Sequence, residues 1–298
     1  GGTHRLIKLR ERIKLLLRDS SPHLKALDDG LLKLFRYWFN SSFLVLEKID
    51  WSTPANVLEK IIEYEAVHEI NSWNDLRARL APSDRQCFAF FHPLIPEDPL
   101  IFVEVALTNE IPTSIEKVIK INREEVEYNK INTAVFYSIS NCQDGLAGIS
   151  FGNFLIKKVA HRLKQEIPGL NKFVTLSPLP GLMRWMEKNA PLTFENCLNK
   201  IDDEENLLKK TFVYLTESNR EDNLPNDPVA RFHLGNGAIL HKINLNADSS
   251  QKGLTQSNGV MVNYLYDLDV VEKNHELFFK NKEVILSSEI KSLKKKYS

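Results

Sequence analysis

The sequence predicts an α+β protein in which a helical bundle, residues 1–82, precedes a mixed α/β domain, residues 83–298. Three observations indicate this class. Apolar side chains recur at helical spacing through the first part of the chain. Short β-prone runs alternate with helical stretches beyond Ala81-Pro82-Ser83. A glycine-bearing turn separates a strong strand candidate from an amphipathic helix in the second part.

Residues 4–81 are predicted to be helical throughout. Ser52-Thr53-Pro54 is typical of a helix start, because a hydroxyl caps free N–H groups and proline is tolerated in the first turn. Asn71-Ser72 is expected to cap a further helix. No chemistry is visible in this segment, so we expect it to serve packing or oligomer contacts. The apolar positions of its first two helices are Leu6, Leu9, Ile13 and Leu17, then Leu24, Leu27, Leu31, Phe35 and Trp38.

The second part is expected to mix strands with helices. Ser177-Pro178 is predicted to begin a helix that runs through Trp185, and a polar loop is predicted between the last two strands. Other helices are predicted at residues 114–120, 154–165, 207–215 and from 271 onward. The predicted strands are Gln86–Phe91, Leu100–Leu107, Thr133–Ile139, Lys172–Leu176, Ala238–Leu245 and Val260–Leu268.

Composition excludes several classes of protein. Lys+Arg and Asp+Glu both number 39, a balance that argues against a dedicated nucleic-acid binder. Cys87, Cys142 and Cys197 form no Cys-x-x-Cys pair, and their sparse, odd count suits a reducing compartment, so we expect a cytoplasmic location. No apolar run reaches the length of a membrane span, and no histidine has a partner at metal-ligand spacing, so neither a membrane nor a metal is expected. A start at Gly1 without methionine suggests a helical domain that is incomplete at its N-terminus.

A glycine turn at Gly145–Gly152 follows the strand candidate Thr133–Ile139 and leads into a helix from Asn153. Glycines allow backbone N–H groups to approach a ligand, and a helix N-terminus carries partial positive charge, so the turn suits a pyrophosphate. It has neither the Walker A nor the Rossmann spacing. The alternative is a tight turn in which glycine supplies a positive φ.

Two further segments contain side chains that suit catalysis. Ser177 follows a predicted strand, and strand ends are where ligands bind in open α/β sheets, although taken alone the segment fits a serine that caps a helix better. His233 precedes Gly-Asn-Gly, which also fits a hairpin turn beside an incidental histidine. Tyr264 and Tyr266 share one face of a strand, where they line a site or pack on a core.

Taken in order, these segments resemble the malonyl-CoA decarboxylase family, in register from about Leu24 to Leu268. The segments that carry the resemblance are His92–Ile101, Val105–Thr108, Phe136–Ser140, Gly145–Lys157, Leu176–Gly181, Phe232–Ala238 and Asn263–Tyr266.

The resemblance implies a helical oligomerisation domain, hence a homo-oligomer, and a catalytic domain with an acyl-CoA N-acetyltransferase-like (GNAT-like) fold. The implied reaction converts malonyl-CoA to acetyl-CoA and CO2 without a metal or an organic cofactor. Ser177 and His233 are the implied catalytic residues, and Asn263 and Tyr266 are implied to line the site. The implied CoA pyrophosphate turn consists of Ala147, Gly148, Ile149, Ser150, Phe151, Gly152 and Asn153.

One departure limits what the resemblance implies. Animal members of the family carry a glutamate and a glutamine where this chain has Ser150 and Ala147, so a role of that glutamate is not carried over. Two alternatives of other classes remain, an acyl-CoA N-acyltransferase and a non-catalytic acyl-CoA sensor. Ser177 and His233 in their family contexts favour the decarboxylase.

Overall fold

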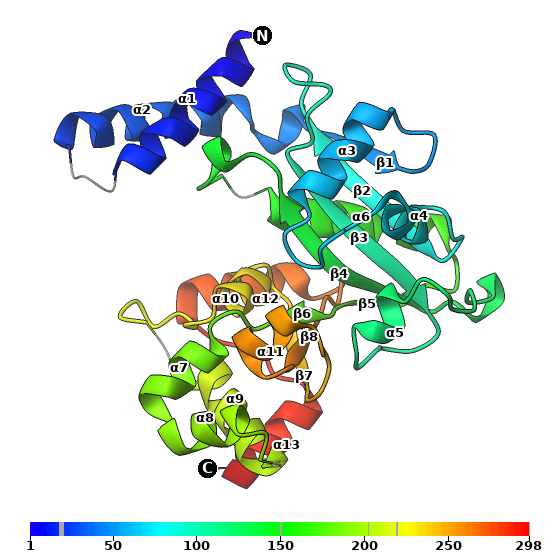
Figure 1. Cartoon of the computed structure of the whole chain (residues 1–298), viewed down its shortest axis with the longest axis vertical. Coiled ribbons are helices and arrows are strands. Elements are labelled where there is room, and N and C mark those ends of the chain that lie inside the picture. Colours follow the sequence, from blue (N-terminus) through cyan, green and yellow to red (C-terminus); the bar gives the residue numbers. More distant parts are fainter. Residues whose placement is uncertain (18–20, 150, 202, 219, 298) are drawn as a thin grey trace. The chain divides into compact units, whose positions relative to one another are not determined.

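The computed structural model describes residues 1–17, 21–149, 151–201, 203–218 and 220–297. They form two compact units (Figure 1), of which unit 1 comprises Gly1–Val105 and Ser138–Pro168, and unit 2 comprises Ala106–Tyr137 and Gly169–Ser298. The chain passes from one unit to the other within strands β3 and β4. The domain boundary expected at residue 82 stays a prediction.

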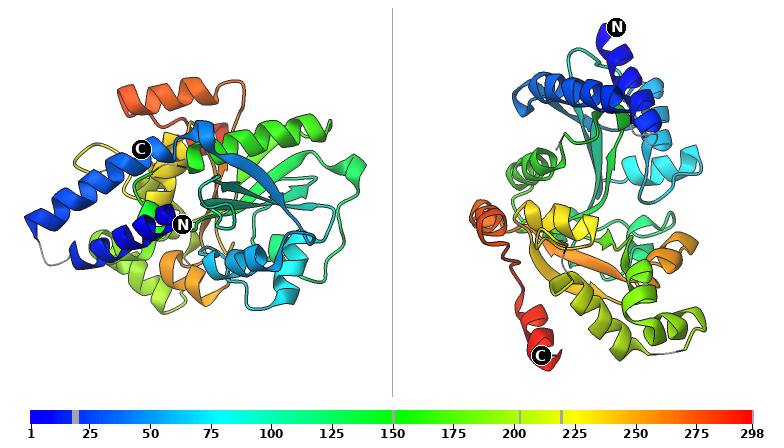
Figure 2. Two further views of the ribbon diagram at one scale, coloured as in Figure 1. Left: turned by 90° about the horizontal axis from the view of Figure 1, so that it is seen from above. Right: turned by 90° about the vertical axis from the view of Figure 1, so that its left-hand side faces the viewer.

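Unit 1 contains five α-helices among its described residues, together with a sheet in the order β1-β2-β3-β4. Helices α1 and α2 run side by side (Figure 2). Apolar side chains of α3, α4 and β2 form the unit's core, and Ile61, Leu76 and Cys87 are fully buried there. The elements are α1 (Gly2–Leu16), α2 (Pro22–Trp38), η2 (Ser41–Phe43), β1 (Val45–Ile49), α3 (Ala55–Tyr64), α4 (Trp73–Leu80), β2 (Arg85–Phe91), β3 (Ile101–Thr108), β4 (Thr133–Asn141), η4 (Asp144–Leu146) and α6 (Gly152–Glu166).

The prediction that residues 4–81 are entirely helical is wrong at β1. This strand pairs antiparallel with β2, from Val45 opposite Phe91 to Ile49 opposite Cys87. It is an edge strand, and of its side chains Ile49 alone is buried, so five residues give no readable strand period. The predicted cap of α4 is confirmed, because the Ser72 side chain accepts the N–H of Asp75.

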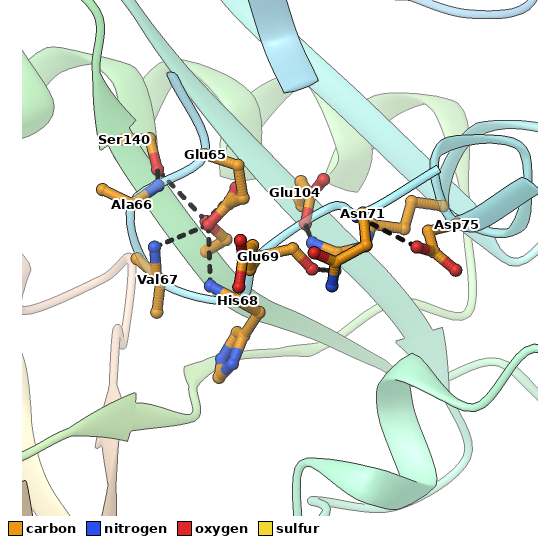
Figure 3. A network of polar contacts seen from close by, with 11 residues as sticks. Glu65, Ala66, Val67, His68, Glu69, Asn71, Asp75, Glu104 and Ser140 are labelled. Carbon is orange, nitrogen blue, oxygen red and sulfur yellow. Dashed lines mark hydrogen bonds and ion pairs between the residues drawn. The ribbon is translucent and has the colours of Figure 1, made fainter. Parts of the chain in front are cut away.

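A polar network ties the segment between α3 and α4 to the sheet of unit 1 (Figure 3). The Glu65 carboxylate accepts the N–H groups of Val67 and His68, and the Ser138 hydroxyl donates to both of its oxygens. Arg79 of α4 forms a buried ion pair with Glu104 of β3 at 3.0 Å. Since both charges are desolvated, burying either side chain without the other would cost much free energy of folding.

Unit 2 contains a mixed sheet in the order β3-β4-β5-β8-β6, with β7 also paired to β8. β4 and β5 are parallel, with Thr133 opposite Lys172, whereas β5, β6 and β7 run antiparallel to β8. Its other elements are α5 (Glu116–Ile119), η3 (Tyr128–Lys130), β5 (Lys172–Thr175), β6 (Ser177–Pro178), α7 (Leu182–Asn189), α8 (Pro191–Leu198), α9 (Glu204–Thr216), α10 (Pro228–Gly235), β7 (Ile239–Asn244), α11 (Gln251–Ser257), β8 (Met261–Leu265), α12 (Val271–Asn281) and α13 (Ser288–Tyr297).

Unit 2 corrects two further predictions. Ser177-Pro178 does not begin a helix but forms β6, because Ser177 pairs with Val262 of β8, and α7 begins only at Leu182. The expected polar loop between the last two strands contains α11, whose N-terminus is capped by the Ser250 side chain. In the described ranges, no helix has the length and apolar character needed to cross a membrane.

Candidate active site

Unit 2 brings together Ser177 and His233, which lie 56 residues apart in sequence. Ser177 Oγ lies 3.1 Å from His233 Nε2, and both residues are buried, at 5% and 3% exposed. Pairing with β8 fixes the backbone at Ser177, and helix α10 carries His233 in its last turn. A hydroxyl within hydrogen-bond distance of an imidazole is an arrangement that can exchange a proton with a bound substrate.

Tyr264 of β8 and Tyr266, just beyond the end of that strand, fix the orientation of the His233 ring. Tyr264 stacks on it, with ring centroids 4.8 Å apart and planes inclined by 24°. The Tyr266 hydroxyl lies 2.9 Å from His233 Nδ1. Both predicted tyrosines therefore contact the histidine, one through its ring face and the other through its hydroxyl.

Burial determines the protonation of this group of residues. Desolvation lowers the pKa of His233 to about 3, so the ring is neutral at pH 7. Burial also raises the pKa of Tyr266 above its ordinary value, so its phenol keeps the proton. A neutral imidazole that accepts the Tyr266 proton at Nδ1 carries its own hydrogen on Nε2, the nitrogen that faces Ser177.

Thr175 extends this chain of polar contacts and is not among the site residues predicted from sequence. The Ser177 hydroxyl donates to Thr175 Oγ1 at 2.9 Å, and the same oxygen accepts the backbone N–H of Tyr264 at 3.2 Å. The signal in the sequence is the spacing of two, which places Thr175 and Ser177 on the same side of an extended chain.

Asp227 positions helix α10 and is a second residue absent from the predicted set. Its Oδ1 accepts the N–H groups of Val229 and Ala230, and its Oδ2 accepts the hydroxyl of Tyr214 at 3.1 Å. Burial raises the pKa of Asp227. The sequence does contain the signal, because aspartate before Pro228 is typical of a helix N-cap followed by proline in the first turn.

Asn263 makes contacts that anchor the sheet. Its amide donates to the carbonyls of Thr175, at 2.9 Å, and Pro112, at 3.3 Å. Its side-chain oxygen accepts the amide of Asn244 at 2.7 Å. Asn263 therefore connects the strand before Ser177 with β8, and its expected part in lining the site stays a prediction.

The predicted CoA turn lies in unit 1. Gly148 has φ +90°, a conformation that residues other than glycine rarely adopt, and α6 begins at Gly152. Phe151 is buried against Phe39, with ring centroids 6.5 Å apart, and so contributes packing. Ser150 lies outside the described residues. The geometry is compatible both with an anion-binding turn and with a purely structural one.

The remaining residues of the predicted turn take part in its backbone contacts. The Ile149 N–H donates to the carbonyl of Leu146 at 3.1 Å, and the carbonyl of Ala147 accepts the guanidinium of Arg10. Asn153 lies in the first turn of α6, where backbone N–H groups have no partner within a helix. Among the described residues no group of three or more His, Cys, Asp or Glu side chains is placed to hold a metal ion, and the expected absence of a metal stays a prediction.

Comparisons with known proteins agree on one family. The model of the malonyl-CoA decarboxylase C-terminal domain matches residues 42–298. The mitochondrial malonyl-CoA decarboxylase of Rattus norvegicus is 35% identical over 336 residues, which cover 98% of this chain and 68% of the relative. Crystal structures of malonyl-CoA decarboxylases from Rhodopseudomonas palustris and Agrobacterium vitis are 46% and 49% identical, with TM-scores of 0.92 and 0.91, and cover 98% of this chain and 76% of theirs.

A more distant likeness concerns the fold. A GNAT-like decarboxylase, GphF, solved in complex with isobutyryl-CoA, has a TM-score of 0.51 at 15% identity, over 75% of this chain and 99% of that one. At such low identity the likeness shows the fold alone. The α+β class and the GNAT-like fold expected from sequence are confirmed.

Proposed function

This chain belongs to the malonyl-CoA decarboxylase family, and on that premise we propose that Ser177 and His233 are its catalytic pair. Its activity is that of a carboxy-lyase that converts malonyl-CoA to acetyl-CoA and CO2. The observation that supports the catalytic assignment best is the buried contact of 3.1 Å between Ser177 Oγ and His233 Nε2.

The reaction needs a proton and a place for negative charge. When the malonyl carboxylate leaves as CO2, the electrons of the broken C–C bond form a thioester enolate, and one proton must then reach the α-carbon. Donors placed where the enolate charge develops lower the barrier. The Ser177 hydroxyl is our candidate to hold the malonyl group and to take part in this proton exchange as the acceptor of the hydrogen bond from His233 Nε2.

His233 is our candidate for the proton donor. The ring is neutral in the resting protein, because burial lowers its pKa to about 3. A malonyl carboxylate bound beside it favours the imidazolium, since an opposite charge stabilises the protonated form. The proton from solvent adds at Nδ1 when the substrate binds, so the Tyr266 oxygen then accepts from Nδ1, and the hydrogen on Nε2 passes to the α-carbon as CO2 leaves. His233 is thereby returned to its neutral form.

Tyr266 is our candidate for a positioning residue. Its hydroxyl donates to Nδ1 and so directs Nε2 towards Ser177. Thr175 positions the serine, because its hydroxyl oxygen accepts a hydrogen bond from the Ser177 hydroxyl and so holds Ser177 Oγ near the imidazole.

The CoA pyrophosphate is proposed to bind the glycine turn at residues 147–153. Two features of unit 1 support this. Gly148 adopts a positive φ, and helix α6 begins at Gly152, so its partly positive N-terminus lies within the proposed turn. No residue of this chain is proposed to hold a metal or an organic cofactor.

Oligomerisation through the first helices is also proposed. Leu15 and Leu16 of α1 and Leu27 and Tyr37 of α2 expose large apolar side chains, which a second copy of the chain could cover. Light scattering of the wild type and of Leu15→Lys tests this, since the variant is expected to be the smaller species. The cytoplasmic location stays a prediction, and the relative from Rattus norvegicus is described as mitochondrial.

One assay tests the function directly. The protein is incubated with malonyl-CoA, and CO2 and acetyl-CoA are measured against time. His233→Asn and Ser177→Ala are each expected to reduce turnover by orders of magnitude while CoA binding is retained, and wild-type turnover in either variant would remove that residue from the mechanism. An acylated amine formed in the presence of added amines would indicate an acyltransferase, and binding without turnover would indicate a sensor.

A further inference from the structure

The glycine turn of unit 1 is held from one side by the first helix. Arg10 of α1 is 2% exposed, and one terminal nitrogen of its guanidinium donates to the carbonyls of Gly145 and Ala147, both at 2.8 Å. Its Nε donates to the Asp28 carboxylate of α2 at 2.8 Å. A buried arginine thus connects both N-terminal helices to the backbone of the turn.

Two other cationic side chains make the same kind of contact. Lys14 of α1 donates to the carbonyl of Asp144 at 3.1 Å, and Arg36 of α2 donates to the carbonyl of Gly148 at 3.4 Å. Together with Arg10, they direct the carbonyls of residues 144, 145, 147 and 148 towards α1 and α2. A larger residue would not fit beside them, because a Cβ at Gly145 would lie 2.1 Å from the carbonyl oxygen of Ile7.

Fixing these carbonyls also fixes N–H groups. A trans peptide is planar, so its N–H points away from its C=O. The contact from Arg10 to the Ala147 carbonyl therefore directs the N–H of Gly148 away from α1. That N–H belongs to the turn proposed to bind pyrophosphate.

We propose that Arg10 is a positioning residue that pre-organises the glycine turn for the CoA pyrophosphate. The proposal rests on the proposed function, which places CoA at this turn. Arg10 itself need not touch CoA, since two backbone carbonyls and Asp28 engage its guanidinium. Pre-organisation improves affinity because ordering of the loop is not required at the moment of binding.

A positioning role of Arg10 and a charge-attraction role predict different effects of replacing Asp28 on CoA binding. If Arg10 attracted CoA through its charge, removal of the neighbouring carboxylate would strengthen CoA binding. If Arg10 acts by holding the turn, loss of Asp28 leaves the guanidinium less well fixed, and binding weakens or stays the same. Lysine at position 10 also distinguishes the positioning role from the charge role. Its ammonium keeps the positive charge but lacks the planar guanidinium that bridges the two carbonyls and the Asp28 carboxylate.

The experiment compares Arg10→Met, Arg10→Lys and Asp28→Asn with the wild type. Steady-state kinetics with malonyl-CoA give kcat and KM, calorimetry gives the Kd of CoA, and hydrogen–deuterium exchange follows the peptide that covers residues 144–152. Lys8→Gln is the matched control, since Lys8 lies on α1 but pairs with Glu11 at the surface.

For Arg10→Met and Arg10→Lys we expect KM and Kd to rise about tenfold or more, which corresponds to the loss of one or two hydrogen bonds. Values of kcat should stay within about threefold of the wild type, because the turn contributes binding rather than chemistry. Exchange in the turn should be faster in the absence of any ligand. Lys8→Gln should match the wild type.

Wild-type KM and Kd in Arg10→Met, recovery of both in Arg10→Lys, or tighter CoA binding by Asp28→Asn would each overturn the proposal. If Arg10→Met does not fold, Arg10→Lys replaces it, and a wild-type KM there would overturn the proposal as well. A wild type that decarboxylates malonyl-CoA while Arg10→Met binds CoA normally refutes the positioning role alone. A wild type that neither binds CoA nor decarboxylates malonyl-CoA refutes the proposed function, and the positioning role with it.

Discussion

Replacement of His233 by glutamine removes a buried imidazole that the folded protein protonates much less readily than the unfolded chain does. Burial lowers the pKa of His233 to about 3, against an ordinary value of 6.5. Above pH 6.5 the ring is neutral in both states and contributes no pH dependence. Between pH 6.5 and about 3 the unfolded chain binds a proton that the folded protein does not, so the free energy of unfolding falls as the pH falls.

The size of the effect follows from that window. Well below pH 6.5 each pH unit lowers the free energy of unfolding by about 1.4 kcal/mol. The unfolded imidazole is already half protonated at pH 6.5, so the loss between pH 6.5 and pH 4.5 is about 2 kcal/mol. His233→Gln lacks this loss. The difference in unfolding free energy between wild type and variant should therefore shift by about that amount over the two pH units.

Urea unfolding at pH 7.5, 6.5, 5.5 and 4.5, followed by circular dichroism, measures this difference. Other groups, such as the half-buried His241, whose pKa burial also lowers, are present in both proteins and cancel. His161→Gln is the control, because it also removes an imidazole, but one that is exposed on α6. Parallel losses of stability in wild type and His233→Gln would refute the reasoning, since the imidazole would then be as easily protonated in the folded protein.

Three further substitutions test other contacts. Tyr266→Phe removes the hydroxyl that orients His233, so kcat should fall at least about tenfold with little change in KM, and a proportional rise in KM would argue against an orienting role. Arg79→Met removes the cation that is paired with the buried Glu104, so urea unfolding should report a loss of about 3–5 kcal/mol, and a loss below 1 kcal/mol would indicate a solvated pair. Asp227→Ala removes the cap of α10 and should cost about 1–2 kcal/mol together with much of kcat; an unchanged kcat would separate the cap from the site.

The sequence predicts the elements whose pattern is local. The helical period between Pro22 and Trp38 and the buried run that begins at Thr133 are both found as predicted, because side-chain period and burial are properties of neighbouring residues. β1 and β6 were not predictable in this way. Each exists because a distant strand pairs with it, and two to five residues carry no period of their own.

In the candidate site, too, features with a local sequence pattern were predictable and features that depend on distant contacts were not. Ser177 and His233 were identifiable because each lies in a short motif that resembles a family, although nothing in either motif predicts a contact across 56 residues. Asp227 carried a readable local signal, the cap followed by proline. Arg10 carried none, since its contacts with the turn are to backbone carbonyls 135 and 137 positions away, and such contacts leave no trace in the side-chain pattern.

The enclosure of His233 has a practical consequence for chemical labelling. Reagents that acylate neutral imidazoles must reach the ring nitrogen, and in the resting protein His233 is only 3% exposed, with Tyr264 stacked on its face. His4, whose side chain is 40% exposed, presents an accessible alternative. Modification at low reagent concentration would therefore mark surface histidines first, and an early loss of turnover would report an opening of the region around α10 rather than simple access to the imidazole.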